Sequence, residues 1–438
     1  MTQGVVNYSR AIFCLRGCPE ADIVGSMSEP IPPLRNIDAA PVEHEGETFI
    51  AMQDPSGYVE TQLILSAPAF FIAASLDGNA GIPELQASFR SQFGGMDVSA
   101  EQIQEIVDYL DDNGFLLNRQ FEKIRERVDG EYAASDTRPA YLADRSYPAD
   151  PAELRSFIDS FFTCEKGPGA MPAQEAGTSP LPGLIVPHID FHRGMAGYAH
   201  GYGKLFARPK PEVVFVFGVA HAGAPVPFIL TRKHFDTPLG KVETDQEILT
   251  RLEGACSWDP YEWEGLHRTE HSIEFQAVML AYHYGPEVKI VPILCSCFSM
   301  EPGRPEPAKL EPVTAFLDTC RDIVAEYGGR AAVIAGADLA HVGKTFGDPF
   351  DIDEGVISDV EDRDTEDLAH IVNGAIDADA FYASVMKDYN ARKVCGLNCI
   401  YATLKTLDGA ISQGTQHHYD YAHDPNGGIV SFASVTLE

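Results

Sequence analysis

Short apolar runs rich in Val, Ile, Phe and Ala recur through the second half of the chain. They lie at 183–188, 213–221, 288–296 and 331–341, and stretches of helical periodicity stand between them. Because the apolar residues of each run are continuous rather than alternating, the runs indicate strands that are buried on both faces. Such strands separated by helices are typical of an α/β fold.

Residues 36–118 carry a different pattern. Two β-prone runs between 48 and 62 flank an Asp-Pro-Ser-Gly turn at 54–57, which predicts a hairpin. Helices are predicted at 63–78, 82–94 and 100–113, the last opening on a capping box of Ser99 and Gln102, and a short strand follows at 115–118. This order predicts a small winged-helix-like α+β domain. Its hydrophobic pattern also resembles peptide-chaperone domains of the PqqD type.

The segments around this domain complete the expected organisation. Residues 1–35 are punctuated by Pro and lack periodicity, so we expect a disordered tail. The highly charged residues 119–140 predict a linker helix. A second domain, the α/β domain of 141–438, opens with a helix for which Asp150 is the predicted N-cap and Pro151 the first residue.

The net charge of the chain argues against some classes of binding partner. Its 438 residues include 32 Lys and Arg against 65 Asp and Glu, for a net charge of −33. Nucleic acids and anionic lipid surfaces both attract clustered cations, so neither is an expected partner. The predicted helix at 100–113 is acidic and has no basic residue, which favours a protein or peptide partner over DNA.

The number of cysteines and the shortness of the apolar runs indicate in which cellular compartment the protein is expected. No run approaches the roughly 18–20 apolar residues that span a bilayer, and the N-terminus lacks a signal-peptide pattern. Nine cysteines are too few for a disulfide scaffold, so we expect free thiols in a reducing cytoplasm. Cys14 and Cys18 either ligate a metal or stand unpaired on the tail.

Polar side chains follow three of the predicted strands. His188 follows the first, His221 the second, and Asp338 and His341 a later one. Asp190 and His192 also lie just past the first strand. Ligands of open α/β sheets bind beyond the carboxyl ends of the strands, because the loops converge there. Several imidazoles in one place are typical of a metal site, so we predict a shared metal site at this edge.

Two helix starts offer further ligands. Residues 270–274 (Glu-His-Ser-Ile-Glu) place Glu270, His271 and Glu274 at one helix start, and Cys395 precedes Gly396 at another. A thiol at a helix N-terminus has a lowered pKa, which favours the thiolate. Cys399, one turn later, is either a core residue or the second thiol of a clip with Cys395.

The chain from about residue 141 to 438 resembles the Memo family, also described as protein B of the AMMECR–Memo–radical-SAM group. The resemblance rests on segments in the family's order: SYPADPAELRSFIDSFF, LIVPHIDF, VFVFGVAH, FDTPLGKVETDQEI, EHSIEFQ, GADLAH and VCGLNCI. Departures from the family pattern, which alter the pocket wall, are Ile189-Asp190-Phe191, Ala222 and Leu397.

The resemblance implies a fold like that of class III extradiol dioxygenases, which hold non-haem Fe(II). It implies a related metal site formed by two His and one Cys, here His188, His221 and Cys395. The candidate catalytic residues that it places around the site are His341, Asp338, Glu270 and His271. Fe(II) or Cu(I) suits such a set, with Zn(II) as an alternative. Radical-SAM and AMMECR-type proteins are the partners that the family association suggests.

Three functions remain open from the sequence. The first is a metal-dependent oxidoreductase with dioxygenase-like chemistry, in which His341 acts as general acid or base and Asp338 orients it. The second is a non-catalytic protein that binds a peptide or partner in a radical-SAM- and AMMECR-linked modification pathway. The third is a zinc hydrolase, in which His341 serves the bound water.

Overall fold

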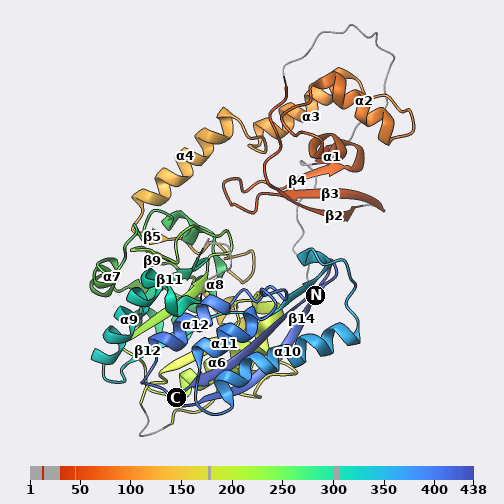
Figure 1. Ribbon diagram of the computed structural model, residues 1–438. Coiled ribbons are helices and arrows are strands. Elements are labelled where there is room, and N and C mark those ends of the chain that lie inside the picture. The colour runs from red at the N-terminus through yellow and green to blue at the C-terminus, as the bar shows by residue number, and fades with distance from the viewer. Residues whose placement is uncertain (1–11, 14–29, 45, 176–178, 300–305) are drawn as a thin grey trace. The chain divides into compact units, whose positions relative to one another are not determined.

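The computed structural model describes residues 12–13, 30–44, 46–175, 179–299 and 306–438 (Figure 1). The chain divides into two compact units, Met1–Ala134 and Ser135–Glu438. Cys14 and Cys18, and with them the predicted N-terminal metal clip, lie outside the described residues.

The N-terminal unit packs three helices on a small sheet with the strand order β1-β4-β3-β2. Its elements are β1 (Ile12–Phe13), β2 (Asp38–His44), β3 (Glu47–Gln53), β4 (Leu63–Ser66), α1 (Ala67–Ala74), α2 (Ile82–Gln92), α3 (Ala100–Asp112) and α4 (Arg119–Ala134). The predicted capping box is confirmed, because the Ser99 side chain accepts from Gln102 N and Gln102 accepts from Ser99 N.

The strands of this unit differ from the prediction in two places. Residues 63–66 form β4, which pairs with β3, and α1 starts only at Ala67 because Ser66 caps it and Pro68 stands in its first turn. Residues 115–118 make a single bridge, Leu34 to Leu116, in place of the predicted wing strand. The winged-helix prediction is therefore not confirmed.

Residues just before the predicted domain boundary also belong to this unit. Ile31 and Arg35 are buried, and Arg35 pairs with Asp54 at 2.8 Å while its guanidinium lies over the Phe121 ring. Asp54 in turn accepts from the backbone N–H groups of 56, 58 and 59. The buried pair thus fixes the loop between β3 and β4, and residues 30–35 are ordered rather than part of a tail.

The C-terminal unit is built on a nine-stranded mixed sheet with the order β10-β11-β7-β12-β6-β15-β13, to which β14 and β8 add on β15 and β11. The strands are β6 (Gly183–Val186), β7 (Val213–Val219), β8 (Phe228–Leu230), β10 (Glu243–Thr244), β11 (Lys289–Cys295), β12 (Ala331–Gly336), β13 (His341–Gly343), β14 (Gly414–Asp424) and β15 (Gly428–Leu437). A separate pair joins β5 (Thr137–Arg138) to β9 (His234–Phe235). The predicted α/β fold is confirmed.

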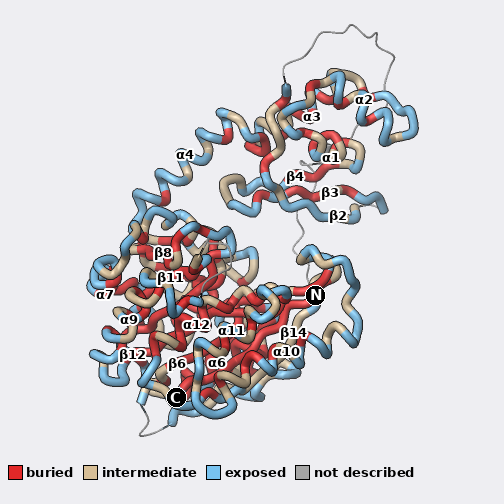
Figure 2. The backbone as a smooth tube through the Cα atoms, viewed as in Figure 1, coloured by how far each residue is buried: buried red, intermediate tan, exposed pale blue. Residues whose placement is uncertain are grey.

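Helices cover both faces of this sheet. They are α5 (Pro151–Thr163), α6 (Phe191–Ala207), α7 (Gln246–Glu253), α8 (His271–Tyr284), α9 (Glu311–Glu326), α10 (Glu354–Val372), α11 (Ala378–Met386) and α12 (Leu397–Thr406). Alternate residues of the central strands enter two different cores, so Phe215 packs with α9 and α12 while Val214 packs with α5, α6 and α8. Figure 2 shows these strands buried along their length, as the continuous apolar runs predict.

The four parallel strands β6, β7, β11 and β12 all end at one edge of the sheet. This edge is where the sequence places its strand-end histidines. In the described part of the chain, no helix combines the length and the apolar character that crossing a membrane requires.

Candidate metal centre

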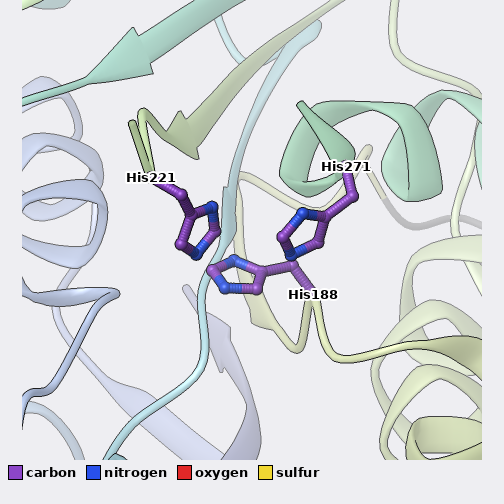
Figure 3. Close-up of side chains that lie close together, drawn as sticks. All are labelled: His188, His221 and His271. Carbon is purple, nitrogen blue, oxygen red and sulfur yellow. The ribbon is translucent and has the colours of Figure 1, made fainter. Parts of the chain in front are cut away.

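Three imidazoles meet at the carboxyl edge of the sheet. His188 follows β6, His221 follows β7, and His271 is the first residue of α8. One ring nitrogen from each of the three lies within 4.8 Å of the others, and the rings point toward one another (Figure 3). The structure therefore brings the two predicted metal ligands together and adds His271, which the sequence had placed among the catalytic candidates.

His188 is buried and its orientation is fixed from both sides. Its Nδ1 lies 2.8 Å from the carbonyl oxygen of Gly336 at the end of β12, and its backbone N–H donates to Asp338 Oδ1 at 2.9 Å. Because a carbonyl can only accept, Nδ1 carries the proton and Nε2 presents its lone pair to the cluster. Burial lowers the pKa of His188 to about 3, so the ring is neutral.

One carboxylate, that of Glu270, holds the other two rings. Glu270 caps α8 through Ser272 N at 3.0 Å, and its oxygens lie 3.0 and 3.1 Å from His221 Nδ1 and 3.2 Å from His271 Nδ1. Although burial opposes the charge, attraction to His221 and His271 holds the pKa of Glu270 well below its usual range. Glu270 is thus an anion that orients two imidazoles.

The two rings that share Glu270 differ in their protonation. Burial lowers the pKa of His271 to about 4. Burial also acts to lower the pKa of His221, but Glu270 and the Cys395 thiol outweigh it and raise that pKa to about 11. The rings stack at 4.6 Å between centroids. His221 is exposed and His271 half-buried, so the cluster has an open side.

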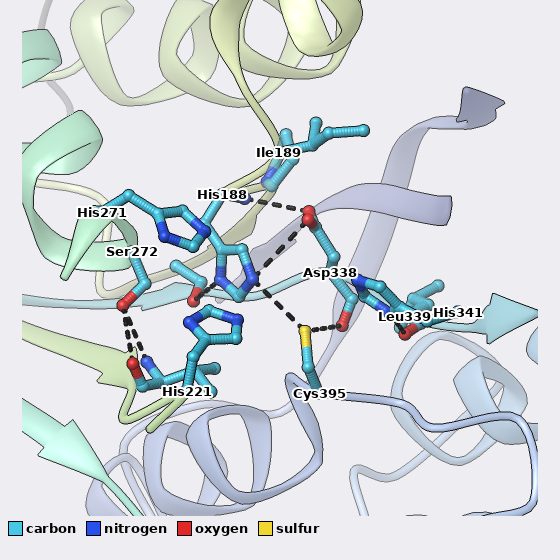
Figure 4. A network of polar contacts seen from close by, with 12 residues as sticks. His188, Ile189, His221, His271, Ser272, Asp338, Leu339, His341 and Cys395 are labelled. Atoms are coloured by element: carbon cyan, nitrogen blue, oxygen red, sulfur yellow. Dashed lines mark hydrogen bonds and ion pairs between the residues drawn. The ribbon is translucent and has the colours of Figure 1, made fainter. Parts of the chain in front are cut away.

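Cys395 reaches the cluster from the turn before α12. Its Sγ lies 3.2 Å from His188 Nε2, the nitrogen that faces the other rings (Figure 4). Burial raises the pKa of this thiol to about 11 even though His221 acts to lower it, so the expected lowering by the helix start is wrong. The following residue must be Gly396, because a Cβ there would lie 2.5 Å from Asp338 O.

Asp338 and His341 lie beside the cluster but do not form the predicted couple. The Asp338 carboxylate contacts His188, with Oδ2 at 3.6 Å from Nε2, and burial raises its pKa. The His341 ring is held instead by Leu339 O, 3.1 Å from Nδ1, and packs edge-on against Phe346. Backbone carbonyls therefore orient the His341 ring, although the Asp338 carboxylate lies close enough to attract it.

Other candidates of the sequence analysis lie away from the cluster. Asp190 caps α6 and pairs with Arg193, and the exposed His192 packs on Phe157. Cys399 is fully buried in the core beside Cys295, which favours the core reading over a clip with Cys395.

Glu274 lies beneath the site, not in it. It is fully buried, forms an ion pair with the equally buried Arg138, and accepts from Leu142 N and the Tyr147 hydroxyl. Arg138 also donates to the carbonyl oxygens of His267 and Glu270, both at 2.9 Å. Sequence reasoning missed Arg138, which supports the residue that orients His221 and His271.

A second buried arginine supports the opposite side of the site. Arg392 forms ion pairs with Asp364 and Asp367 of α10, and its carbonyl accepts from His341 N at 2.7 Å. Asp364 also accepts from the Ser431 hydroxyl on β15. Arg392 therefore ties the loop that carries Cys395 to the strand that carries His341.

Comparison with known proteins gives one consistent result. The sequence model of a family described as Memo-like protein matches residues 138–436. A "MEMO1 family protein" of Aquifex aeolicus is 26% identical over 93% of this chain and 99% of its own length, so its match extends into the N-terminal unit. "MEMO1 family" proteins of Methanopyrus kandleri and Thermus thermophilus are 29% and 27% identical, over 68% and 58% of this chain and 98% and 69% of their own lengths.

Proposed function

Because the chain belongs to the Memo family, we propose that it binds one transition-metal ion through His188, His221 and Cys395 and uses it in redox chemistry. The observation that carries the proposal is a pair of imidazoles, each of which is oriented by a partner at its Nδ1. Gly336 O holds Nδ1 of His188 and Glu270 holds Nδ1 of His221, so Nε2 of each ring is the nitrogen that would bind the metal. His221 would have to give up the proton that its raised pKa retains. A carboxylate or carbonyl behind a metal-binding imidazole is the usual arrangement in such sites.

Two side chains compete for the third position. Cys395 Sγ lies 3.2 Å from His188 Nε2, which is close enough for both atoms to hold one metal ion. His271 offers the alternative, because its ring nitrogen belongs to the close cluster. We assign the third position to Cys395, and His271 then lines the open side.

Bound iron or copper would supply oxygen and electron-transfer chemistry, and zinc would supply a Lewis acid. The chain's own contribution is the orientation of the ligands and a proton site. His341 can hold or release a proton, because its imidazole lies beside the cluster in an orientation fixed by Leu339 O. The open side beside His221 and His271 leaves room for a substrate.

The test is the metal content of protein purified without oxygen, measured by elemental analysis and EPR. We expect about one Fe or Cu per chain in the native protein, loss of that metal in His188→Ala and in Cys395→Ala, and retention in the control His192→Ala. Retention in Cys395→Ala with loss in His271→Ala would move the third position to His271. Metal that survives His188→Ala would refute the site.

Glu270→Gln should weaken metal binding about 10- to 100-fold, because the neutral amide holds Nδ1 of His221 and His271 less strongly. Competition with a chromogenic chelator measures this affinity. Glu287→Gln changes an exposed glutamate and is the matched control. Equal affinities of the two variants would remove Glu270 from the support of the site.

Oxygen consumption with a panel of catechols then tests the redox assignment. Turnover that disappears in His341→Ala while the metal stays bound supports dioxygenase-like chemistry with His341 as the proton site. A zinc-loaded protein that consumes no oxygen would contradict the redox proposal and leave hydrolysis or partner binding as the function.

A further inference from the structure

The two carbonyl groups that flank His188 along the chain are each held by a side chain from a helix. Gln276 of α8 donates from Nε2 to Pro187 O at 3.1 Å, and the Tyr198 hydroxyl of α6 donates to Ile189 O at 3.0 Å. Both side chains are fully buried. Because the carbonyls before and after His188 are both fixed, the backbone that carries its ring has little freedom to move.

Each polar atom of the Gln276 amide has a partner. Nε2 also donates to Ser272 O at 3.1 Å, and Oε1 accepts from the fully buried Tyr202 hydroxyl at 2.8 Å. Carbonyls can only accept, so the amide nitrogen must face them and the amide oxygen must face the hydroxyl. Tyr202 of α6 therefore fixes the orientation of the amide that holds Pro187 O.

The same amide lies against the residue that orients the His188 ring. Gly336 supplies the carbonyl oxygen 2.8 Å from His188 Nδ1, and a Cβ on Gly336 would stand 2.8 Å from Gln276 Nε2. The amide thus packs directly on the backbone of Gly336. A change at Gln276 would loosen two of the contacts that set His188, those of Pro187 O and Gly336 O.

We propose that Gln276 is the positioning residue of His188, because it fixes the backbone that carries the imidazole and so directs Nε2 toward the metal. The inference rests on the metal site proposed above. Removal of a group that holds a metal ligand from behind weakens metal binding about 10- to 100-fold. Gln276 acts one step further back, through the backbone, so its effect belongs at the lower end of that range.

Two variants and one matched control test the proposal in the full chain. Gln276→Met keeps the length of the side chain and removes the amide, whereas Tyr202→Phe keeps Gln276 and removes only the hydroxyl behind it. The control Thr244→Val removes a buried hydrogen bond to Lys233 O of 2.7 Å at the amino end of β11, opposite the edge with the histidines. Circular dichroism and the thermal midpoint show whether each variant folds. If Gln276→Met does not fold, Tyr202→Phe decides with the same readouts.

The first readout is the ring N–H proton of His188 in NMR spectra of the metal-free chain, identified by its absence in His188→Ala. In Gln276→Met its hydrogen bond to Gly336 O should weaken, so we expect a shift to higher field and exchange with water about tenfold faster. Tyr202→Phe should change the resonance in the same direction by less, and Thr244→Val should leave it unchanged. An unchanged resonance in folded Gln276→Met would overturn the proposal.

The second readout is the binding of Co(II), whose absorption bands report the geometry of its ligands. We expect Gln276→Met to weaken Co(II) binding about tenfold and to shift the bands, and Thr244→Val to change neither. A lower thermal midpoint with unchanged Co(II) affinity and bands would make Gln276 a purely structural residue and overturn the proposal. Bands that persist in His188→Ala would refute the metal site itself, and the NMR readout would then still decide whether Gln276 positions His188.

Discussion

Arg138→Met is expected to lower the free energy of unfolding of the C-terminal unit by about 3–5 kcal/mol. Arg138 and Glu274 are both fully buried, and the variant would leave the Glu274 carboxylate in the core without its cation. It would also leave the carbonyl oxygens of His267 and Glu270 without their donor. An uncompensated buried charge is among the most destabilising changes known in a protein core.

Urea unfolding followed by tryptophan fluorescence measures this effect in the right unit, because both tryptophans, Trp258 and Trp263, belong to residues 135–438. Arg330→Met is the control. It breaks an exposed pair with Glu212 and should cost no more than about 1 kcal/mol. Adding Glu274→Met to Arg138→Met should recover part of the loss, since both charges are then gone. If Arg138→Met lowers the free energy of unfolding no more than Arg330→Met does, the buried ion pair is not what stabilises this region.

Arg392→Met should have an effect of similar size, about 3–5 kcal/mol at neutral pH, because it leaves Asp364 and Asp367 facing each other in the core. Burial already raises the pKa of Asp364, even though Arg392 acts to lower it. In the variant this carboxyl therefore protonates more readily in the folded than in the unfolded chain. The penalty is present above the folded-state pKa and is relieved as the pH falls through it, so the loss of stability should shrink toward acid pH.

Urea titrations of native protein and variant at neutral and mildly acidic pH test this dependence. Arg363→Met breaks a pair with Asp388 that is partly exposed, and it should show a smaller loss with little change between the two pH values. A loss in Arg392→Met that grows as the pH falls would contradict the assignment to unpaired carboxylates.

The features predicted from sequence are those set by neighbouring residues. The runs at 183–188 and 213–221 became β6 and β7, because strands buried on both faces need continuous apolar sequence. Asp150 caps α5 as expected, since its side chain accepts from Ala152 N and Glu153 N. His188 and His221 converge because parallel strands end at one edge of a sheet.

The features that the sequence did not reveal depend on contacts between distant segments. Nothing near Glu274 in sequence indicates that it meets Arg138, and the two residues of the Glu-His-Ser-Ile-Glu segment differ in role only because Glu274 faces the core. The residues of β4 are predicted to be helical, because their apolar run is short and continues into α1.

The position of β15 has a consequence for how the protein is made. This strand is the last of the sheet in sequence, yet it lies inside the sheet and covers the edge of β6, one of the first strands to be synthesised. Until residue 437 has left the ribosome, the nascent sheet therefore exposes an unpaired apolar edge at β6. Such edges promote association between chains. The sheet is therefore protected against such association only when its last strand has been added.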